Sequence, residues 1–317
     1  MRIIVFGKDG QLGKAFGDLF KSSNASQSID IHYVGRNECD LSNEEAVKNV
    51  LAKIAPDLII NAAAYTAVDK AETEVEIAFA INANAPELMA TYASKHDATL
   101  LHFSTDYVFD GTQDRPYLES DVRSPLGIYG KSKAAGEELI ENVFSDSASG
   151  RFAILRTSWV YGEGQNFIRT ILRLAKERDQ LRVIHDQYGV PTSAAWLAQV
   201  GLDLVLDQHF QLRSFPSGIY HAVPNGETTW HGLARLVIQT ASEQGIQLKI
   251  GPQSIEPILA SEYPLPAPRP QNSRLNNAKL PDFLDRQGDV TKLQHWNMPW
   301  DESVKQYVVS LARSGLI

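Results

Sequence analysis

Residues 3–13 read Ile-Ile-Val-Phe-Gly-Lys-Asp-Gly-Gln-Leu-Gly, and this stretch decides the fold. The apolar run Ile3–Phe6 stops at Gly7, and a helix-like pattern follows over Gln11–Phe20. Such a succession predicts a buried strand, a glycine turn and a helix. A chain that begins in this way favours an α/β fold.

Gly7, Gly10 and Gly13 recur at every third position of this turn. Glycine permits a tight turn and lets the backbone approach a ligand closely, while the helix N-terminus offers unpaired amides and the positive end of its dipole. We therefore expect the diphosphate of a dinucleotide cofactor here, with Gln11 and Leu12 beside it. The alternative is a purely structural turn.

Apolar runs and helical patterns continue to alternate over the first hundred residues. The further predicted strands are Ile29–Val34, Asp57–Ile60 and Thr99–Phe103. The predicted helices between them are Glu44–Ile54 and Ala83–Lys95. Ser42, with Glu45 three residues later, is expected to cap the first of these helices. The alternation predicts a Rossmann-like, doubly wound parallel sheet whose ligands lie beyond the carboxyl ends of the strands.

Residues 1–160 are expected to form the dinucleotide-binding domain, and residues 161–317 mainly a smaller, discontinuous α/β substrate-binding lobe. Glycine and proline become denser in the second half, and the tract 256–270 holds prolines that oppose helix and central strand alike. A helical pattern over Ala194–Leu206 predicts a segment near 190–220 that returns to the first domain.

The composition excludes several classes of protein. Hydrophobic residues make up 43% of the 317 residues, and the net charge of −8 disfavours a nucleic-acid-binding surface. The single cysteine, Cys39, allows neither an intramolecular disulfide nor a cysteine-built zinc site, which fits a reducing cytoplasm. No stretch approaches the roughly 18 apolar residues of a membrane span or resembles a signal peptide. We expect a cytoplasmic protein with no membrane partner.

Arg36 follows the second predicted strand, where an acid would bind a free ribose hydroxyl and an arginine would accept a phosphate. This favours NADPH as the cofactor, the alternative being a solvated surface arginine. Asp40 and Leu41 fit the adenine edge, although Asp40 could equally be a cap. Because neither residue would exclude NADH, we expect that it is also accepted.

Tyr129 and Lys133 stand four residues apart, which places them on one face of a helix. An adjacent ammonium would stabilise the phenolate and bring the pKa of the tyrosine toward neutrality, making it a usable acid. Thr105 ends the fourth predicted strand, and its hydroxyl could bond a substrate carbonyl. The glycine turn, this hydroxyl and the Tyr/Lys pair occur in the order typical of short-chain dehydrogenases/reductases.

Longer motifs narrow this resemblance. The chain resembles the dTDP-4-dehydrorhamnose reductases from end to end, in the segments Asn61-Ala-Ala-Ala-Tyr-Thr-Ala-Val-Asp-Lys-Ala-Glu72, Ser104-Thr-Asp-Tyr-Val-Phe109, Ser124-Pro-Leu126, Arg156-Thr-Ser-Trp-Val-Tyr161 and Arg269-Pro-Gln-Asn-Ser-Arg-Leu275. The resemblance implies NADPH-dependent reduction of the carbon-4 ketone of a dTDP-sugar, dTDP-4-dehydro-L-rhamnose.

The resemblance also implies roles for individual residues. Thr105, Tyr129 and Lys133 would be catalytic, with Tyr129 and Lys133 also contacting the cofactor. Cofactor contacts would come from Ala62, Ala63, Ala64 and Thr66. Contacts to the sugar and nucleotide would come from Val68, Thr105, Asp106, Tyr107 and Trp159.

Arg269 is our candidate for the substrate's diphosphate, because a guanidinium presents a planar fork to phosphate oxygens. The alternative is an arginine that pins the proline-rich loop to the body of the protein. Trp230 and His231 are interpreted as packing residues of the lobe, and His185 and His221 as structural.

One departure from the family concerns metal. Some of these reductases dimerise around a magnesium ion held by glutamates, whereas the matching regions here offer Ala15, Ala195 and Trp196. Without carboxylates there is no site for a hard cation. We expect no metal, and either a monomer or a homodimer.

Two rival functions remain open. A nucleotide-sugar epimerase or dehydratase, or another reductase of this superfamily, would use the same cofactor turn and Tyr/Lys pair. Dehydratases have Asp-Glu after the catalytic hydroxyl, whereas Asp106-Tyr107 follows Thr105 here. A non-catalytic, dinucleotide-binding regulatory subunit is the other rival, and the intact Thr105, Tyr129 and Lys133 argue against it.

Overall fold

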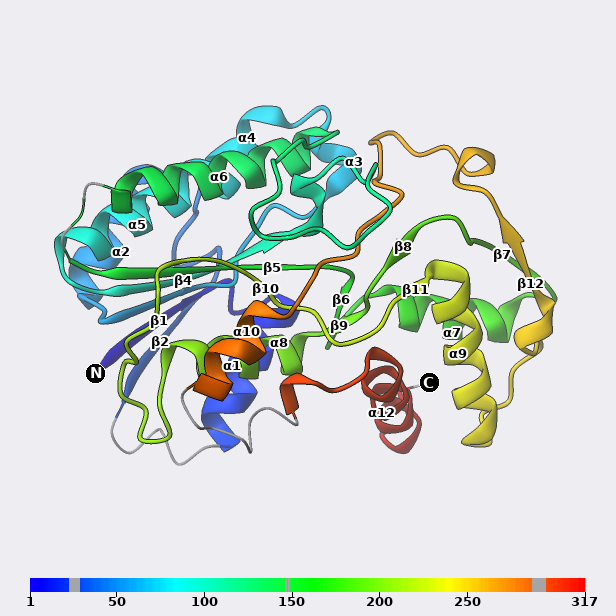
Figure 1. Cartoon of the computed structure of the whole chain (residues 1–317). Helices are drawn as coiled ribbons and strands as arrows, with labels where there is room; N and C mark the ends of the chain where they lie inside the picture. Colours follow the sequence, from blue (N-terminus) through cyan, green and yellow to red (C-terminus); the bar gives the residue numbers. More distant parts are fainter. Residues whose placement is uncertain (23–28, 146, 148, 287–294, 317) are drawn as a thin grey trace.

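The computed structural model describes residues 1–22, 29–145, 147, 149–286 and 295–316, and centres on a six-stranded sheet (Figure 1). All neighbouring strands in this sheet run parallel. In spatial order they are β10 (Gly218–His221), β5 (Arg151–Thr157), β4 (Thr99–Thr105), β3 (Leu58–Asn61), β1 (Arg2–Phe6) and β2 (Asp30–Val34). The winding direction reverses between β1 and β3, which places a topological switch point at their carboxyl ends. The predicted Rossmann-like, doubly wound sheet is confirmed.

Both faces of the sheet are buried, because apolar residues occupy successive positions along each central strand. Within β1, Ile4 and Phe6 belong to the core on one face, and Ile3 and Val5 to the core on the other. The helices over the first face are α2 (Glu44–Ile54), α5 (Ala85–Lys95) and α6 (Ile128–Ser145). The helices over the second face are α1 (Gln11–Ser22), α8 (Ala194–Val205) and α10 (Lys279–Arg286), and Figure 1 shows them opposite the first group.

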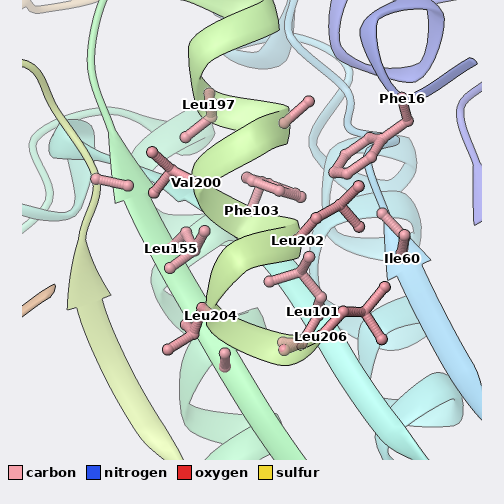
Figure 2. Packing of buried hydrophobic residues seen from close by; sticks show 14 of the residues in the cluster. Phe16, Ile60, Leu101, Phe103, Leu155, Leu197, Val200, Leu202, Leu204 and Leu206 are labelled. Atoms are coloured by element: carbon pink, nitrogen blue, oxygen red, sulfur yellow. The ribbon is translucent and has the colours of Figure 1, made fainter. Parts of the chain in front are cut away.

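Helix α8 lies against the second face although it comes late in the chain. Figure 2 shows Leu197 and Val200 of this helix packed with Phe103 and Leu155 of the sheet and with Phe16 of α1. All five side chains are less than 9% exposed. Segments from both halves of the chain therefore complete the core beneath the strands that carry the site.

A third apolar core lies beside the carboxyl ends of the strands. It draws mainly on helices α7 (Phe167–Glu177), α9 (Trp230–Glu243) and α12 (Trp300–Arg313), and on the two-stranded sheet of β7 (Leu181–Ile184) and β12 (Ile255–Ile258). Two further two-stranded sheets are formed by β6 (Val160–Tyr161) with β9 (Thr192–Ser193) and by β8 (Tyr188–Gly189) with β11 (Thr228–Thr229). Figure 1 shows this part as a smaller body beside the main sheet.

The structure corrects two local predictions. Asn43, and not Ser42, caps α2, because its side chain accepts a hydrogen bond from the amide of Ala46 at 3.2 Å. The helix expected over Ala83–Lys95 begins as a π-helical turn over Ala80–Asn84, preceded by the short helices α3 (Val68–Ala71) and α4 (Val75–Phe79). The proline-rich tract 256–270 contains the end of the small peripheral strand β12 and the 3₁₀ turn Ala260–Glu262, and forms no long helix or central strand, as its composition favours. None of the helices in the described ranges is long and apolar enough to cross a membrane.

Candidate active site

A cavity of about 930 Å³ opens beyond the carboxyl ends of the central strands. Gly7 follows β1, Ala62 follows β3, and Thr105 and Thr157 end β4 and β5, and all four line the cavity. Its volume lies at the upper end of the range for small-molecule sites. Its lining residues extend from the glycine turn to Trp159 and Trp230 of the smaller body.

Most of the sequence-predicted site residues meet in this one cavity. Those lining it are Gly7, Gly10, Gln11, Leu12, Arg36, Asp40, Leu41, Ala62, Ala63, Ala64, Thr66, Val68, Thr105, Asp106, Tyr107, Tyr129, Lys133 and Trp159. Gly13 and Arg269 are the two predicted contacts that do not line it. Gly13 packs closely against the carbonyl of Gly7, and Arg269 is paired with Asp69.

The three glycines of the turn have different steric roles. Gly7 has a φ of +85°, and a Cβ there would lie 2.7 Å from the amide nitrogen of Ala63. A Cβ on Gly13 would lie 2.0 Å from the carbonyl oxygen of Gly7, so this glycine lets α1 pack against the turn. A Cβ on Gly10 would meet only that same oxygen, at 3.4 Å. Gly10 therefore faces open space at the start of α1, and the arrangement fits a diphosphate on the helix N-terminus.

Arg36 and Asp40 stand together at the end of the cavity next to β2. The positive charge of Arg36 is among the causes that lower the pKa of Asp40, after the hydrogen bonds from Ser42. Oδ1 of Asp40 accepts these bonds from the amide and hydroxyl of Ser42, at 3.0 and 2.8 Å. Asp40 thus caps its own loop, while Arg36 is exposed at the rim. Both residues line the cavity.

Tyr129 stands in the first turn of α6 and faces the end of β4. Removal of water from around its hydroxyl raises its pKa to about 12, and a hydrogen bond with Thr105 acts in the opposite direction. The ring of Tyr107 packs edge-on against it, with centroids 5.4 Å apart. The expectation that Lys133 brings this pKa toward neutrality is not met. The ammonium of Lys133 is bonded to the carbonyl oxygen of Phe103 and lies beside His102 instead. Tyr129 is consequently protonated at neutral pH.

Lys133 lies one helical turn after Tyr129, as the spacing predicts, and is only 1% exposed. Its Nζ donates to the carbonyl oxygen of Phe103 at 2.7 Å and lies 3.1 Å from Nε2 of His102. Burial lowers the pKa of Lys133 to about 8, although the charge of Glu137 opposes this effect. The ammonium is therefore anchored at the end of β4, beside the cavity.

Asp106 is a buried carboxyl group in the wall of the cavity. Its Oδ1 accepts a hydrogen bond from the hydroxyl of Thr105 at 3.0 Å, while Oδ2 accepts none within 3.5 Å, although the hydroxyl of Ser273 also acts to lower the pKa of this carboxyl group. Burial raises the pKa of Asp106 to about 6. A carboxylate oxygen left unsatisfied in a binding cavity is available to a polar ligand.

Trp230 is a lining residue that the sequence does not reveal. Trp230 packs against the core of the lobe, as the sequence interpretation expected, and it also stacks against Trp159 at the cavity wall. Nothing in the sequence brings the two together, because Trp230 starts α9 far along the chain from Trp159. His231 and His221 have structural contacts instead, to the carbonyl oxygens of Ile255 and Asn276.

Arg269 is bound by a carboxylate of the protein. Its two terminal nitrogens lie 2.7 and 2.8 Å from the two oxygens of Asp69, in a bidentate pair. Asp69 also accepts a hydrogen bond from the amide of Ala267 at 3.1 Å. These contacts pin the proline-rich loop to α3, which is the alternative role considered above. They leave the diphosphate role untested.

No group of three His, Cys, Asp or Glu side chains suited to a metal ion occurs within the described ranges. The expectation of a metal-free protein rests on Ala15, Ala195 and Trp196, and stays a prediction.

Comparison with known proteins identifies the family of this chain. The family model described as the RmlD substrate binding domain matches residues 1–309. The dTDP-4-dehydrorhamnose reductase of Salmonella typhimurium is 44% identical over 290 residues, which cover 90% of this chain and 92% of that protein. A dTDP-4-dehydrorhamnose reductase from Clostridium acetobutylicum has a similar structure, with a TM-score of 0.83, 32% identity, and 98% and 99% of the two chains covered.

A second solved structure bears on the cofactor. The dTDP-4-dehydrorhamnose reductase of Bacillus anthracis, determined in complex with NADP, superposes with a TM-score of 0.80 at 31% identity, covering 98% of this chain and 99% of that one. The chain belongs to the dTDP-4-dehydrorhamnose reductase family.

Proposed function

We propose that this protein reduces the carbon-4 ketone of dTDP-4-dehydro-L-rhamnose with NADPH, giving dTDP-L-rhamnose. The observation that carries the proposal is the convergence of Thr105, Tyr129 and Lys133 on one cavity that begins at the glycine turn. The family membership supplies the class of substrate. We further propose that residues 1–160, with the return segment near 190–220, form the cofactor domain, and that the remainder forms the substrate lobe.

The cofactor fits the first half of the cavity. Gly10 leaves space at the N-terminus of α1, and the wall continues over Ala62 to Thr66. Arg36 at the rim would accept the phosphate that distinguishes NADPH from NADH. When bound there, NADPH supplies the hydride that reduces the ketone.

Tyr129 would act as the general acid. As carbon 4 gains the hydride, the π bond of the carbonyl breaks and its electron pair takes the proton from the Tyr129 hydroxyl. The raised pKa of Tyr129 means that this proton is present at neutral pH. Thr105 would hold the carbonyl oxygen by turning its single hydroxyl proton from Asp106 to that oxygen. Lys133 would hold the ribose next to the nicotinamide.

The substrate would occupy the other end of the cavity. Val68, Asp106, Tyr107 and Trp159 line it there, and Asp106 has an oxygen free for a sugar hydroxyl. Arg269 remains our candidate for the substrate diphosphate. Its pairing with Asp69 means that a diphosphate would have to share or replace this carboxylate.

An assay with purified protein tests the proposal. Incubation with dTDP-4-dehydro-L-rhamnose and either reduced cofactor should oxidise NADPH, and NADH more weakly, in proportion to the sugar reduced. An epimerase or dehydratase would change the sugar without net oxidation of the cofactor. A regulatory subunit would bind NADPH and leave the sugar unchanged, and either result would refute the proposal. A cytoplasmic location and a monomeric or homodimeric state remain predictions.

A further inference from the structure

His102 occupies a position in the sheet where an apolar residue would ordinarily pack. It is 0% exposed within β4, on the same side of the strand as Leu100, two residues earlier. Leu100, Ile59 and Ile154 on that face are apolar. A buried imidazole has an unfavourable free energy of desolvation unless its nitrogens are bonded. Its place therefore calls for an explanation.

Both ring nitrogens of His102 have partners. Nδ1 lies 3.0 Å from the side-chain nitrogen of Asn61 on β3, and Nε2 lies 3.1 Å from Nζ of Lys133 on α6. Asn61 and His102 are register partners on adjacent strands, and Asn61 is also fully buried. The three side chains thus form one buried polar row that runs from β3 across β4 to α6.

The charges allow one assignment for the contact with Lys133. Burial, together with the Lys133 ammonium, lowers the pKa of His102 well below its ordinary value, so the imidazole is neutral and carries a single N–H. An ammonium can only donate hydrogen bonds. When Lys133 is charged, Nε2 of His102 must accept from it, and the ring proton resides on Nδ1. The side-chain amide of Asn61 must then present its oxygen, and not its nitrogen, to Nδ1, because two donors cannot bond each other.

We propose that His102 is a positioning residue for the reduction, which holds the Lys133 ammonium at the end of β4. The inference rests on the proposed function, because Lys133 is there the residue that holds the nicotinamide ribose. His102 and the carbonyl oxygen of Phe103 together take two of the three N–H groups of Lys133. The third N–H group of Lys133 is left for the ligand. A lysine side chain is otherwise flexible, so fixing it in advance lowers the entropy lost when the ligand binds.

Three substitutions separate this role from ordinary packing. The amide of His102→Gln can reach the position of Nε2 and accept from Lys133, whereas the amide of His102→Asn reaches only the position of Nδ1 and keeps the contact with Asn61. His102→Leu keeps the volume and loses both contacts. We expect His102→Leu and His102→Asn to lower kcat about 10- to 100-fold with little change in the KM for the sugar, and His102→Gln to recover to within about fivefold of the wild type.

NADPH titration, followed by protein fluorescence, gives a readout that does not depend on turnover. His102→Leu should weaken NADPH binding about 5- to 10-fold in the wild-type background and less than about twofold when combined with Lys133→Met, because the two residues act through one interaction. If His102→Leu does not fold, the Gln and Asn variants still decide the question.

Two results would overturn the inference: a His102→Gln variant no more active than His102→Asn, or equal losses of NADPH affinity with and without Lys133. Failure of the proposed function is distinguishable from both. A wild-type protein that binds NADPH but does not reduce dTDP-4-dehydro-L-rhamnose would refute the function, and the titrations would still measure the coupling between His102 and Lys133.

Discussion

The indole rings of Trp159 and Trp230 lie stacked, with centroids 3.7 Å apart and planes 16° from parallel. Trp159 has a φ of +47°, an uncommon conformation for a bulky residue. A Cβ on Gly189 would lie 2.5 Å from its ring, so Gly189 leaves the space that the ring occupies. Trp159 is thus clamped between the backbone of β8 and the side chain of Trp230, at the wall of the cavity.

Trp230→Ala should release Trp159 from this position. We expect the KM for the sugar nucleotide to rise about 3- to 10-fold, matching the roughly 0.5–1.5 kcal/mol that an aromatic pair contributes beyond its buried area. Affinity for NADPH should be unchanged, and Trp230→Phe should show a smaller effect. Steady-state kinetics and a cofactor titration measure both quantities. An unaltered KM would return Trp230 to the role of a packing residue.

Tyr129→Phe removes the proposed proton donor and keeps the ring. We expect turnover to fall about 100-fold or more, the scale of general acid catalysis, while NADPH binding is nearly intact. Tyr92→Phe is a matched control, because Tyr92 lies on α5 and does not line the cavity. Retained turnover in Tyr129→Phe would show that another group supplies the proton.

Two glycine substitutions in the same turn should have different consequences, one for cofactor affinity and the other for stability. Gly10→Val fills the space expected for the diphosphate, so NADPH affinity should fall by at least roughly tenfold while the protein remains folded. Gly13→Ala places a Cβ within 2.0 Å of the Gly7 carbonyl oxygen, so the free energy of unfolding should fall by about 1–3 kcal/mol. Cofactor titration and thermal unfolding distinguish them. Unchanged NADPH binding in Gly10→Val would leave the turn with a structural role only.

Arg36→Ala tests the choice of cofactor. If Arg36 contacts the 2′-phosphate, NADPH affinity should fall by roughly 1.5–3 kcal/mol, the range for hydrogen bonds to charged groups, and NADH affinity should hardly change. Arg36→Lys, which keeps the charge without the planar fork, should lie in between. Equal losses for both cofactors would mean that Arg36 packs on the adenine, and no loss for either would make it a solvated surface residue.

Asp106 should destabilise the protein at neutral pH. Its folded-state pKa of about 6 exceeds the ordinary value of 3.8, so the folded state binds the proton more tightly, and stability falls as pH rises from about 4 to 6. Asp106→Asn removes the buried charge, and its free energy of unfolding should exceed that of the wild type by about 1–3 kcal/mol at pH 7.5.

The difference should vanish at about pH 2.5, well below the ordinary pKa of 3.8, where the wild-type carboxyl group is protonated in both states. Denaturant unfolding at the two pH values measures it, and Asp114→Asn, at an exposed position, serves as the control. A gap of the same size at both pH values would show that burial of the charge is not its cause.

The sequence was sufficient to predict the sheet and the edge where ligands bind. Runs such as Leu58–Asn61 are buried on both faces, and apolar residues at successive positions reveal this directly. Candidate site residues could be predicted where they lie on one short segment of the sequence, as in the glycine turn and the Tyr129–Lys133 pair. The cap of α2 was misplaced by one residue, because Ser42 and Asn43 both favour that position and local pattern does not choose between them.

The remainder of the site depends on contacts between distant segments. Trp230 reaches Trp159 only because α9 packs beside the cavity, and Asp69 reaches Arg269 only because the proline-rich loop folds back over α3. The raised pKa of Tyr129 reflects its burial, which the spacing to Lys133 does not report. Such features follow from the tertiary structure and leave no local signal in the sequence.

The most direct test of the proposed reduction follows the hydride itself. The purified protein is incubated with dTDP-4-dehydro-L-rhamnose and NADPH that carries deuterium on the transferred position of the nicotinamide, and the product is analysed by mass spectrometry and NMR. We predict dTDP-L-rhamnose with one deuterium bound to carbon 4, and one NADP⁺ formed for each sugar reduced. Unlabelled product, or recovery of the unchanged keto sugar with the cofactor still reduced, would contradict the proposed function.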